Sequence, residues 1–167
     1  MSPRVVLVGP MGAGKTTVGV LLARAWDTSA HDTDDDVEAA AGKSVPEIFV
    51  DDGESTFRAL EKVAVAAALA EHDGVLSLGG GAVLDPETRT LLHGHRVVFL
   101  SVGLSEAVKR VGLGSSRPLL LGNVRSRIKA LLDERTPVYE SVATETVDTD
   151  GLPAEQVAEE ILRRVPS

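Results

Sequence analysis

Residues 9–16 read G-P-M-G-A-G-K-T, which is a complete phosphate-binding motif. Its glycines let backbone N–H groups approach an anion closely, and the helix expected after the motif directs its positive end to the same place. The Lys15 ammonium can reach the outer phosphates of a nucleotide, and the Thr16 hydroxyl can ligate Mg²⁺. The apolar run 5–8 precedes the motif, as the strand–loop–helix context requires. The motif therefore predicts binding of a nucleoside triphosphate.

An acidic cluster, His31 to Asp36, follows further along the chain. A carboxylate near a phosphate-bound Mg²⁺ can hold the metal through its waters, and one near a substrate hydroxyl can orient that hydroxyl or accept its proton. Asp32 and Asp34 are two residues apart on an expected extended segment, so their side chains should point to the same side. We predict that Asp32 and Asp34 share these two tasks. Asp35 and Asp36 fit the acidic first turn of a helix. We expect His31 to take no part in binding or catalysis.

Three consecutive glycines, Gly79 to Gly81, come directly after the buried-type apolar run 75–78. Such a run of glycines raises the entropic cost of folding, and it suits neither a strand nor a helix. It is explained if a ligand contacts bare backbone whose N–H groups are free to bind it. An ordinary loop is the alternative interpretation.

Two arginines are candidates for binding a substrate carboxylate by paired N–H bonds. Arg58 lies early in an expected helix with Glu61 three residues later, within pairing distance. Arg135 precedes a proline at which the last long helix is expected to break. Phe49 and Phe57 can wall a small pocket near Arg58, or belong simply to the core. For the arginines, a solvated surface position is the alternative.

Arg110 and Arg117 flank a segment rich in glycine and serine. A mobile segment that carries arginine opposite a phosphate loop can close over ATP, exclude water and neutralise the transferring phosphoryl group. We therefore expect a lid in this part of the chain.

Strands alternate with helices along the chain, which indicates an α/β fold with a mostly parallel sheet of about five strands and helices on both faces. The expected strands are 4–8, 28–33, 75–78, 97–102 and 146–149. The expected helices are 15–26, 34–41, 44–49, 54–71, 86–92, 105–111, 124–144 with an interruption near Pro137, and 153–165. In such folds ligands bind beyond the carboxyl ends of the strands. The phosphate motif, the acidic cluster and the triple glycine all follow expected strands, so they should share one edge of the sheet.

The bulk composition fits a single globular domain of 167 residues. The net charge of −8 and the pI near 5.0 argue against nucleic acid or an anionic membrane as the main partner. The chain has no cysteine and no apolar run of membrane-spanning length, and its start leaves no room for a signal peptide, so we expect a cytoplasmic protein. No apolar strand ends in the aspartate that switch GTPases and motor ATPases use for Mg²⁺, which disfavours both classes.

These motifs occur together, and in this order, in the shikimate kinase family, which the chain resembles over essentially its whole length. The matching segments are 9–17 (GPMGAGKTT), 32–34 (DTD), 48–49 (IF), 53–54 (GE), 57–58 (FR), 78–81 (LGGG), 117–120 (RPLL) and 135–139 (RTPVY). The phosphate motif alone is shared with many kinases, but the ordered set is specific. Leu152 departs from the family pattern, which often has a basic or amide side chain there, and Trp26 stands where small residues are usual.

The resemblance implies transfer of the γ-phosphate of ATP to the 3-hydroxyl of shikimate, giving shikimate 3-phosphate and ADP, a step toward chorismate and the aromatic amino acids. Carried over by position, the ATP-binding residues are Gly12, Ala13, Gly14, Lys15, Thr16, Thr17, Arg110, Arg117 and Pro118. Those of the acceptor site are Asp34, Phe49, Phe57, Arg58, Glu61, Gly79, Gly80, Gly81 and Arg135. One Mg²⁺ per subunit would be bound directly by Thr16 and through water by Asp32. Lys15, Asp34 and Arg117 would be catalytic, with Asp34 as the base.

The family also implies a P-loop NTPase fold of the nucleoside-monophosphate-kinase type, a three-layer α/β/α sandwich. Within one domain, 1–167, the substrate-binding region would be about 33–61 and the lid about 112–122. We expect a monomer whose partners are ATP and shikimate. Two alternatives stay open: a kinase for another small molecule, such as gluconate or a nucleotide, and a nucleotide-dependent binding or regulatory module without phosphoryl transfer.

Overall fold

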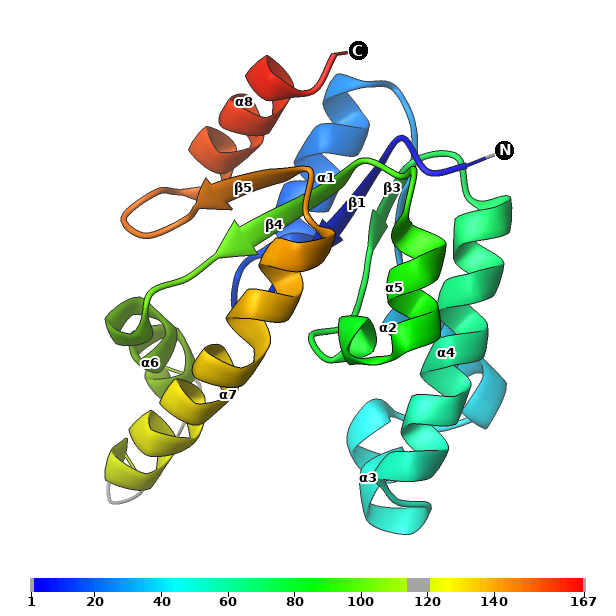
Figure 1. Ribbon diagram of the computed structural model, residues 1–167, viewed down its shortest axis with the longest axis vertical. Coiled ribbons are helices and arrows are strands. Elements are labelled where there is room, and N and C mark those ends of the chain that lie inside the picture. Colours follow the sequence, from blue (N-terminus) through cyan, green and yellow to red (C-terminus); the bar gives the residue numbers. More distant parts are fainter. Residues whose placement is uncertain (1, 114–120, 167) are drawn as a thin grey trace.

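Five parallel strands form one sheet in the order β2-β3-β1-β4-β5 (Figure 1). The computed structural model describes residues 2–113 and 121–166. The strands are β1 (Val5–Val8), β2 (Ala30–Asp32), β3 (Val75–Ser77), β4 (Val97–Ser101) and β5 (Glu145–Asp148). Their parallel pairing confirms the predicted sheet, and the expected strand limits differ from the observed ones by one or two residues.

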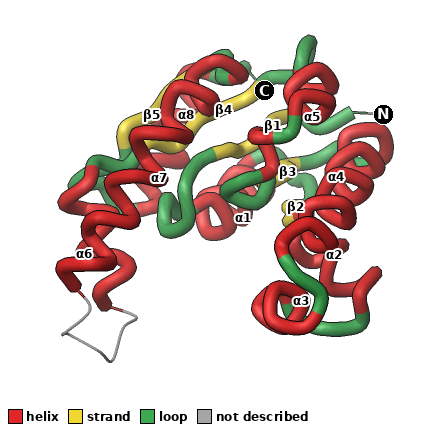
Figure 2. Tube along the Cα trace, turned by 60° about the horizontal axis from the view of Figure 1, so that its bottom comes forward, coloured by secondary structure: helices red, strands yellow, loops and turns green. Residues whose placement is uncertain are grey.

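Helices cover both faces of this sheet, as the alternating pattern predicts (Figures 1 and 2). They are α1 (Lys15–Ala25), α2 (Thr33–Ala41), α3 (Val45–Asp51), α4 (Glu54–Glu71), α5 (Pro86–Leu92), α6 (Leu104–Leu113), α7 (Leu121–Val142) and α8 (Ala154–Arg164), with a short 3₁₀ turn η1 (Ala82–Leu84). The three-layer α/β/α arrangement of a P-loop NTPase is thereby confirmed. None of the helices within residues 2–113 and 121–166 has the length and apolar character needed to cross a membrane.

The sheet is buried on both faces, so its strands are almost continuously apolar. Alternate residues of β1 point to opposite layers: Val5 and Leu7 join the cluster that contains α1 and α8 side chains, whereas Val6 and Val8 join the cluster that contains α4, α5 and Tyr139 of α7. These two aliphatic layers hold the carboxyl ends of β1, β2 and β3 at one edge of the sheet. The loops that follow these strands carry the predicted chemistry.

A third, smaller cluster joins α2, α3 and α4 away from the sheet, through the buried side chains Val37, Ile48 and Phe57. The start of α3 is defined by a capping box, as its sequence predicts: the Glu47 N–H donates to the Ser44 hydroxyl at 3.3 Å, and the Ser44 N–H donates to the Glu47 carboxylate at 3.4 Å. This cluster fixes the position of the N-terminal half of α4, which carries Arg58.

The predicted interruption of the last long helix is wrong, because α7 continues through Pro137 to Val142. Proline removes one helical N–H, which would have bonded to the Asp133 carbonyl. Both residues are exposed, so water can satisfy that carbonyl. Tyr139, which is buried on the opposite side, packs the last turn of α7 against the sheet.

Trp26, which had no functional explanation in the sequence, has a structural one. It caps the C-terminus of α1, packs against the core, and lies 4.6 Å from the Arg4 guanidinium that covers its ring. The chain then turns at Asp27, whose φ of 53° is in the left-handed region.

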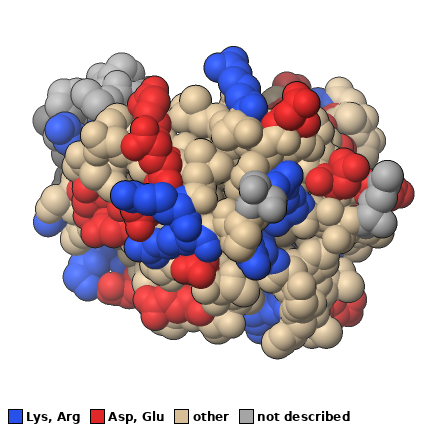
Figure 3. Space-filling view, turned by 90° about the horizontal axis from the view of Figure 1, so that it is seen from above, with Lys and Arg blue, Asp and Glu red and all other residues tan. Residues whose placement is uncertain are grey.

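Charged side chains of both signs are interspersed on the face shown in Figure 3, which is seen from the side of the two chain ends. The described residues of this face form no extended basic surface of the kind that nucleic acid would require. The distribution agrees with the acidic net charge of −8.

Candidate active site

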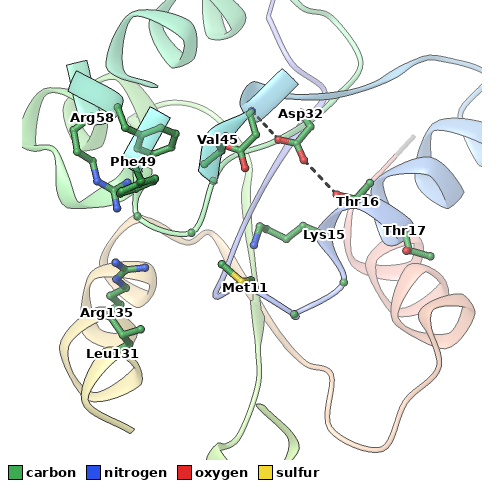
Figure 4. A pocket seen from close by; sticks show the side chains of 17 residues that line it. Met11, Lys15, Thr16, Thr17, Asp32, Val45, Phe49, Arg58, Leu131 and Arg135 are labelled. Carbon is green, nitrogen blue, oxygen red and sulfur yellow. Dashed lines mark hydrogen bonds between the residues drawn. The ribbon is translucent and has the colours of Figure 1, made fainter. Parts of the chain in front are cut away.

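A cleft of about 510 Å³ lies at the carboxyl edge of the sheet, where the three predicted loops meet (Figure 4). Most of the predicted site residues line it together. Its lining is Met11, Gly12, Gly14, Lys15, Thr16, Thr17, Asp32, Asp34, Val45, Phe49, Phe57, Arg58, Gly79, Gly80, Gly81, Leu131 and Arg135. Ala13 is buried beneath the loop, and Glu61 is buried behind Arg58. Arg117 and Pro118 lie outside the described residues.

The phosphate loop connects β1 to α1 and depends on glycine for its shape. A Cβ on Gly9 would lie 2.6 Å from the Leu100 carbonyl oxygen, and the φ angles of Gly12 and Gly14 are 84° and 91°. The Lys15 ammonium donates to the carbonyl oxygens of Gly9 at 2.7 Å and Pro10 at 3.0 Å. Burial lowers the pKa of Lys15 to about 8, against the opposing effect of two nearby carboxylates. The loop thus presents a cation and helix N–H groups to the cleft.

Asp32 ends β2 and connects the phosphate loop to the acidic cluster. One of its oxygens accepts a hydrogen bond from the Thr16 hydroxyl at 3.2 Å (Figure 4). The other accepts from the Asp34 N–H at 2.9 Å and caps the N-terminus of α2. Asp32 is therefore held by two independent contacts, beside the hydroxyl that the phosphate motif offers to a metal.

Asp34 lies in the first turn of α2, which agrees with the expected helix 34–41, but the extended geometry predicted for the Asp32 and Asp34 pair was wrong. Asp32 and Asp34 nevertheless both line the cleft, because the strand ends and the helix begins between them. Burial raises the pKa of Asp34 to about 6, and the neighbouring Asp32 and Glu61 carboxylates add to the increase. Its buried Oδ1 has no hydrogen-bond partner among the described residues.

The other two acids of the cluster behave as expected. Asp35 and Asp36 belong to the first turn of α2, where the helix dipole favours them. The Asp36 carboxylate accepts from the Nε2–H of the His31 ring at 2.6 Å, and neither side chain lines the cleft.

Arg58 and Glu61 form the predicted pair on α4. Nη1 of Arg58 donates to Oε1 of Glu61 at 2.7 Å, and the Glu61 side chain is only 4 % exposed. The second Glu61 oxygen is buried and has no partner among the described residues. Burial raises the pKa of Glu61, and the ion pair with Arg58 opposes this shift. Arg58 lines the cleft, where its guanidinium can bind a ligand, and the buried Glu61 carboxylate fixes its position.

The triple glycine lets these side chains approach the backbone. A Cβ on Gly79 would lie 2.8 Å from Glu61 Oε2 and 2.9 Å from Asp34 Oδ1, and one on Gly81 would lie 2.6 Å from both terminal nitrogens of Arg58. The close approach therefore excludes any larger residue at these two positions unless the charged side chains move.

Arg135 of α7 completes the cleft on the side opposite α4. Figure 4 shows the guanidinium groups of Arg58 and Arg135 pointing toward each other, with Lys15 across the cleft from both. Nε of Arg135 is buried and unpaired within the described part of the chain. Two guanidinium groups that converge in this way suit a carboxylate, which can accept paired N–H bonds from them.

Arg110 lies outside this lining and contacts the phosphate loop from α6. Its guanidinium donates to the Gly12 carbonyl oxygen at 2.8 Å, and to the hydroxyl and carbonyl oxygens of Thr149, each at 3.3 Å. The residue thus connects α6, which leads into the predicted lid, with the phosphate loop and the loop after β5.

Three apolar lining residues were not predicted: Met11, Val45 and Leu131. Leu131 precedes Arg135 by one helical turn, so the spacing alone could have placed it on the same face of α7. Met11 lies inside the phosphate motif, and its side chain is 82 % exposed. The sequence carries no signal for this exposure. Together with Phe49 they add an apolar wall to an otherwise polar cleft.

The parallel sheet, the phosphate loop at its carboxyl edge, and the acid and arginines across the cleft define a P-loop kinase of the small-molecule type. A family model described as shikimate kinase matches residues 11–166. The chain belongs to the shikimate kinase family, whose members are kinases that transfer phosphate to shikimate.

Individual relatives agree with this assignment. The chain is 60 % identical over 161 residues to a shikimate kinase of Salinispora arenicola, with 96 % of each chain covered. It is 56 % identical over 160 residues to one of Streptomyces avermitilis, covering 96 % of this chain and 94 % of the relative. The solved shikimate kinase of Acinetobacter baumannii in complex with shikimate superimposes with a TM-score of 0.89 at 35 % identity, covering 99 % of this chain and 93 % of that one. A gluconokinase of Sinorhizobium meliloti, at 20 % identity and a TM-score of 0.57, shares the fold.

Proposed function

We propose that this protein transfers the γ-phosphate of ATP to the 3-hydroxyl of shikimate, releasing shikimate 3-phosphate and ADP. The observation that carries the proposal is the cleft itself, which brings the Lys15 ammonium, the Asp34 carboxylate and the Arg58 and Arg135 guanidinium groups together. The A. baumannii relative, of nearly the same fold, was solved with shikimate bound. Shikimate combines a carboxylate with ring hydroxyls, and this cleft offers cations for the former and a carboxylate for the latter.

Catalysis in this arrangement is mainly positioning and charge neutralisation. Arg58 and Arg135 bind the acceptor carboxylate, and Asp34 orients the attacking hydroxyl and takes its proton. Lys15 leaves the carbonyl oxygens of its own loop and neutralises charge on the transferred phosphoryl group. Arg117, together with the adenine contacts of Arg110 and Pro118, remains a prediction from the family pattern.

Residues at the start of α1 and at the end of β2 fit a magnesium ion bound with ATP. The Thr16 hydroxyl and the Asp32 carboxylate are oxygen donors 3.2 Å apart beside the phosphate loop, and Mg²⁺ prefers such donors together with its own waters. We assign Thr16 as the direct ligand and Asp32 as the residue that holds the metal's waters. Bound there, the ion would neutralise charge on the β- and γ-phosphates.

Asp32→Asn tests this assignment. The amide oxygen still accepts from the Asp34 N–H, so the cap of α2 survives, but the negative charge is lost. We expect the Mg²⁺ concentration at half-maximal activity to rise by about 10- to 100-fold, as for other residues that orient a metal's ligands. Thr16→Ser, which keeps the hydroxyl, is the matched control and should leave the Mg²⁺ requirement unchanged. An unaltered Mg²⁺ titration for Asp32→Asn would remove Asp32 from the site.

The two shifted pKa values predict different pH limits for the two substrates. Asp34 must be ionised to act as a base, so kcat/KM for shikimate should fall about tenfold per pH unit below a pKa of about 6. Lys15 must be protonated to attract phosphate, so kcat/KM for ATP should fall above its pKa of about 8. Initial rates from pH 5 to 9.5, with each substrate varied in turn, check both. A shikimate profile that stays flat down to pH 5 would contradict the role of Asp34.

A coupled ADP-release assay with shikimate, with gluconate and with no acceptor tests the proposed reaction. We expect ADP release in the assay that contains shikimate, and none in the assays with gluconate or without an acceptor. Release with gluconate in its place would identify another small-molecule kinase of this fold. Absence of release with every acceptor, despite ATP binding, would favour a nucleotide-dependent regulatory module.

We also propose that the protein works as a monomer, because one chain supplies both halves of the cleft. We further propose a cytoplasmic location, as predicted from the sequence. Within this single domain, about 33–61 would serve as the substrate-binding region, and the lid predicted over about 112–122 includes residues 114–120, which lie outside the described part of the chain. Light scattering of the purified protein with and without both substrates measures the oligomeric state, and a dimer would contradict this part of the proposal.

A further inference from the structure

Tyr139 contacts the triple glycine from beneath, although it does not line the cleft. The side chain is on α7, one helical turn after Arg135, and it is 1 % exposed. Its hydroxyl donates to the Gly80 carbonyl oxygen at 2.5 Å, and its ring packs on Phe99 of β4 with the ring centroids 5.0 Å apart. Burial raises the pKa of Tyr139 above its usual value, so the hydroxyl is protonated at neutral pH and acts as a donor.

This hydrogen bond determines the direction of the peptide group between Gly80 and Gly81. The peptide is trans and planar, so its C=O and N–H point in opposite directions. Tyr139 holds the carbonyl toward the buried layer beneath α7. The N–H of Gly81 must then point away from that layer, toward the cleft that Gly81 lines.

Consecutive glycines do not hold a peptide orientation by themselves, because without a Cβ both signs of φ cost about the same. An external restraint is therefore needed if the N–H groups of this turn are to be ready for a ligand. The hydroxyl of Tyr139 supplies one from a residue 59 positions away in the chain.

The restrained peptide lies among the groups that bind the two substrates. A Cβ on Gly81 would meet the guanidinium of Arg58 at 2.6 Å, and one on Gly80 would lie 3.6 Å from both Arg135 Nη1 and the Met11 N–H nitrogen. The Gly81 N–H is thus a neutral donor beside the arginine that we assign to the acceptor carboxylate.

We propose that Tyr139 is a positioning residue for the acceptor: its hydroxyl orients the Gly80–Gly81 peptide so that the Gly81 N–H donates to the carboxylate held by Arg58. The same bond ties α7, which carries Arg135, to the turn beside Arg58, so both arginines keep their separation. The inference rests on the proposed function, because the positioning role of Tyr139 requires an acceptor substrate that bears a carboxylate.

Tyr139→Phe removes the hydroxyl and keeps the ring. We expect KM for shikimate to rise about tenfold, the value of one hydrogen bond to a charged group, while kcat and KM for ATP change less than about threefold. Phe99→Leu is the matched control, because it disturbs the packing of the same ring and leaves the hydroxyl in place. That variant should melt at a lower temperature and keep the wild-type KM for shikimate.

Titration calorimetry with shikimate gives the same comparison without turnover, with an expected tenfold loss of affinity for Tyr139→Phe alone. Unchanged shikimate affinity in that variant would overturn the positioning role. So would equal rises in KM for both substrates that Phe99→Leu reproduces, because they would show a merely structural effect. Failure of the wild-type protein to phosphorylate shikimate is a separate result that would remove the proposed function itself.

Discussion

Asp34→Asn should lower kcat with shikimate by about 10²- to 10⁴-fold, the usual contribution of a positioned base. The amide keeps the shape of the carboxylate but cannot accept the proton of the attacking hydroxyl. Affinity for ATP should stay within about threefold of wild type, because Asp34 contacts neither the phosphate loop nor the Thr16 hydroxyl by a hydrogen bond in the described residues. Single-turnover kinetics with saturating ATP measure the loss in the chemical step.

The same variant should be more stable than wild type at neutral pH. The folded-state pKa of Asp34, about 6, lies above the ordinary value of 3.8 for an aspartate, so ionising this residue costs free energy of folding. That cost is absent below pH 3.8, grows as pH rises to about 6, and is complete above it. Because Asp34 is only half-buried, solvent screening reduces the cost to about 1 kcal/mol, or about 2–4 °C in Tm.

Paired measurements of turnover and melting temperature therefore separate a functional acid from a structural one. A fall in turnover with a higher Tm at pH 7.5, and equal Tm values near pH 4, is the expected combination. Near-normal turnover would remove Asp34 from the role of base, and a lower Tm would show that its carboxylate stabilises the fold. Asp35→Asn, an exposed neighbour in the same helical turn, is the control: it should leave turnover unchanged, and it should lower Tm slightly rather than raise it, because a charge that the helix dipole favours is lost.

The fold was predictable from the sequence because its signals are local. Helices α4 and α5 begin and end at the predicted residues, where glycine and proline delimit regular apolar patterns. The phosphate loop, the strands and the order of the elements follow from similar signals. The continuation of α7 through Pro137 was not predictable, because it depends on Tyr139 packing against the sheet and on solvent reaching one carbonyl.

The candidate site was predictable in its members and less so in its geometry. Strand ends brought the expected loops together, and Asp34 lies in the expected helix, but the extended geometry assumed for the pair was wrong, since Asp32 both ends a strand and caps α2. Contacts between distant residues had no signal in the sequence: Arg110 with the Gly12 carbonyl, 98 positions apart, and Tyr139 with that of Gly80. Such contacts depend on how the layers pack, which periodicity does not reveal.

Arg58→Ala should raise KM for shikimate by roughly 10- to 100-fold, because it removes a charged donor from the acceptor carboxylate. KM for ATP should not change. The variant should also lose about 1–3 kcal/mol of stability, since it leaves the Glu61 carboxylate, 4 % exposed, without its partner at 2.7 Å. The pKa of Glu61 is already raised by burial, and loss of Arg58 should raise it further. Steady-state kinetics and thermal melts measure the two effects.

A second substitution distinguishes these two consequences of losing Arg58. In Arg58→Ala/Glu61→Gln the buried group is neutral, so most of the lost stability should return, while KM for shikimate should stay as high as in the single variant. This result would show that the lost stability comes from the unpaired Glu61 carboxylate and that the lost shikimate affinity comes from the missing Arg58 guanidinium itself. Recovery of KM along with stability would instead mean that Arg58→Ala acts by disturbing the fold, and the acceptor carboxylate would have to be assigned to Arg135 alone. If only the affinity for ATP fell in both variants, Arg58 would belong to the donor half of the cleft.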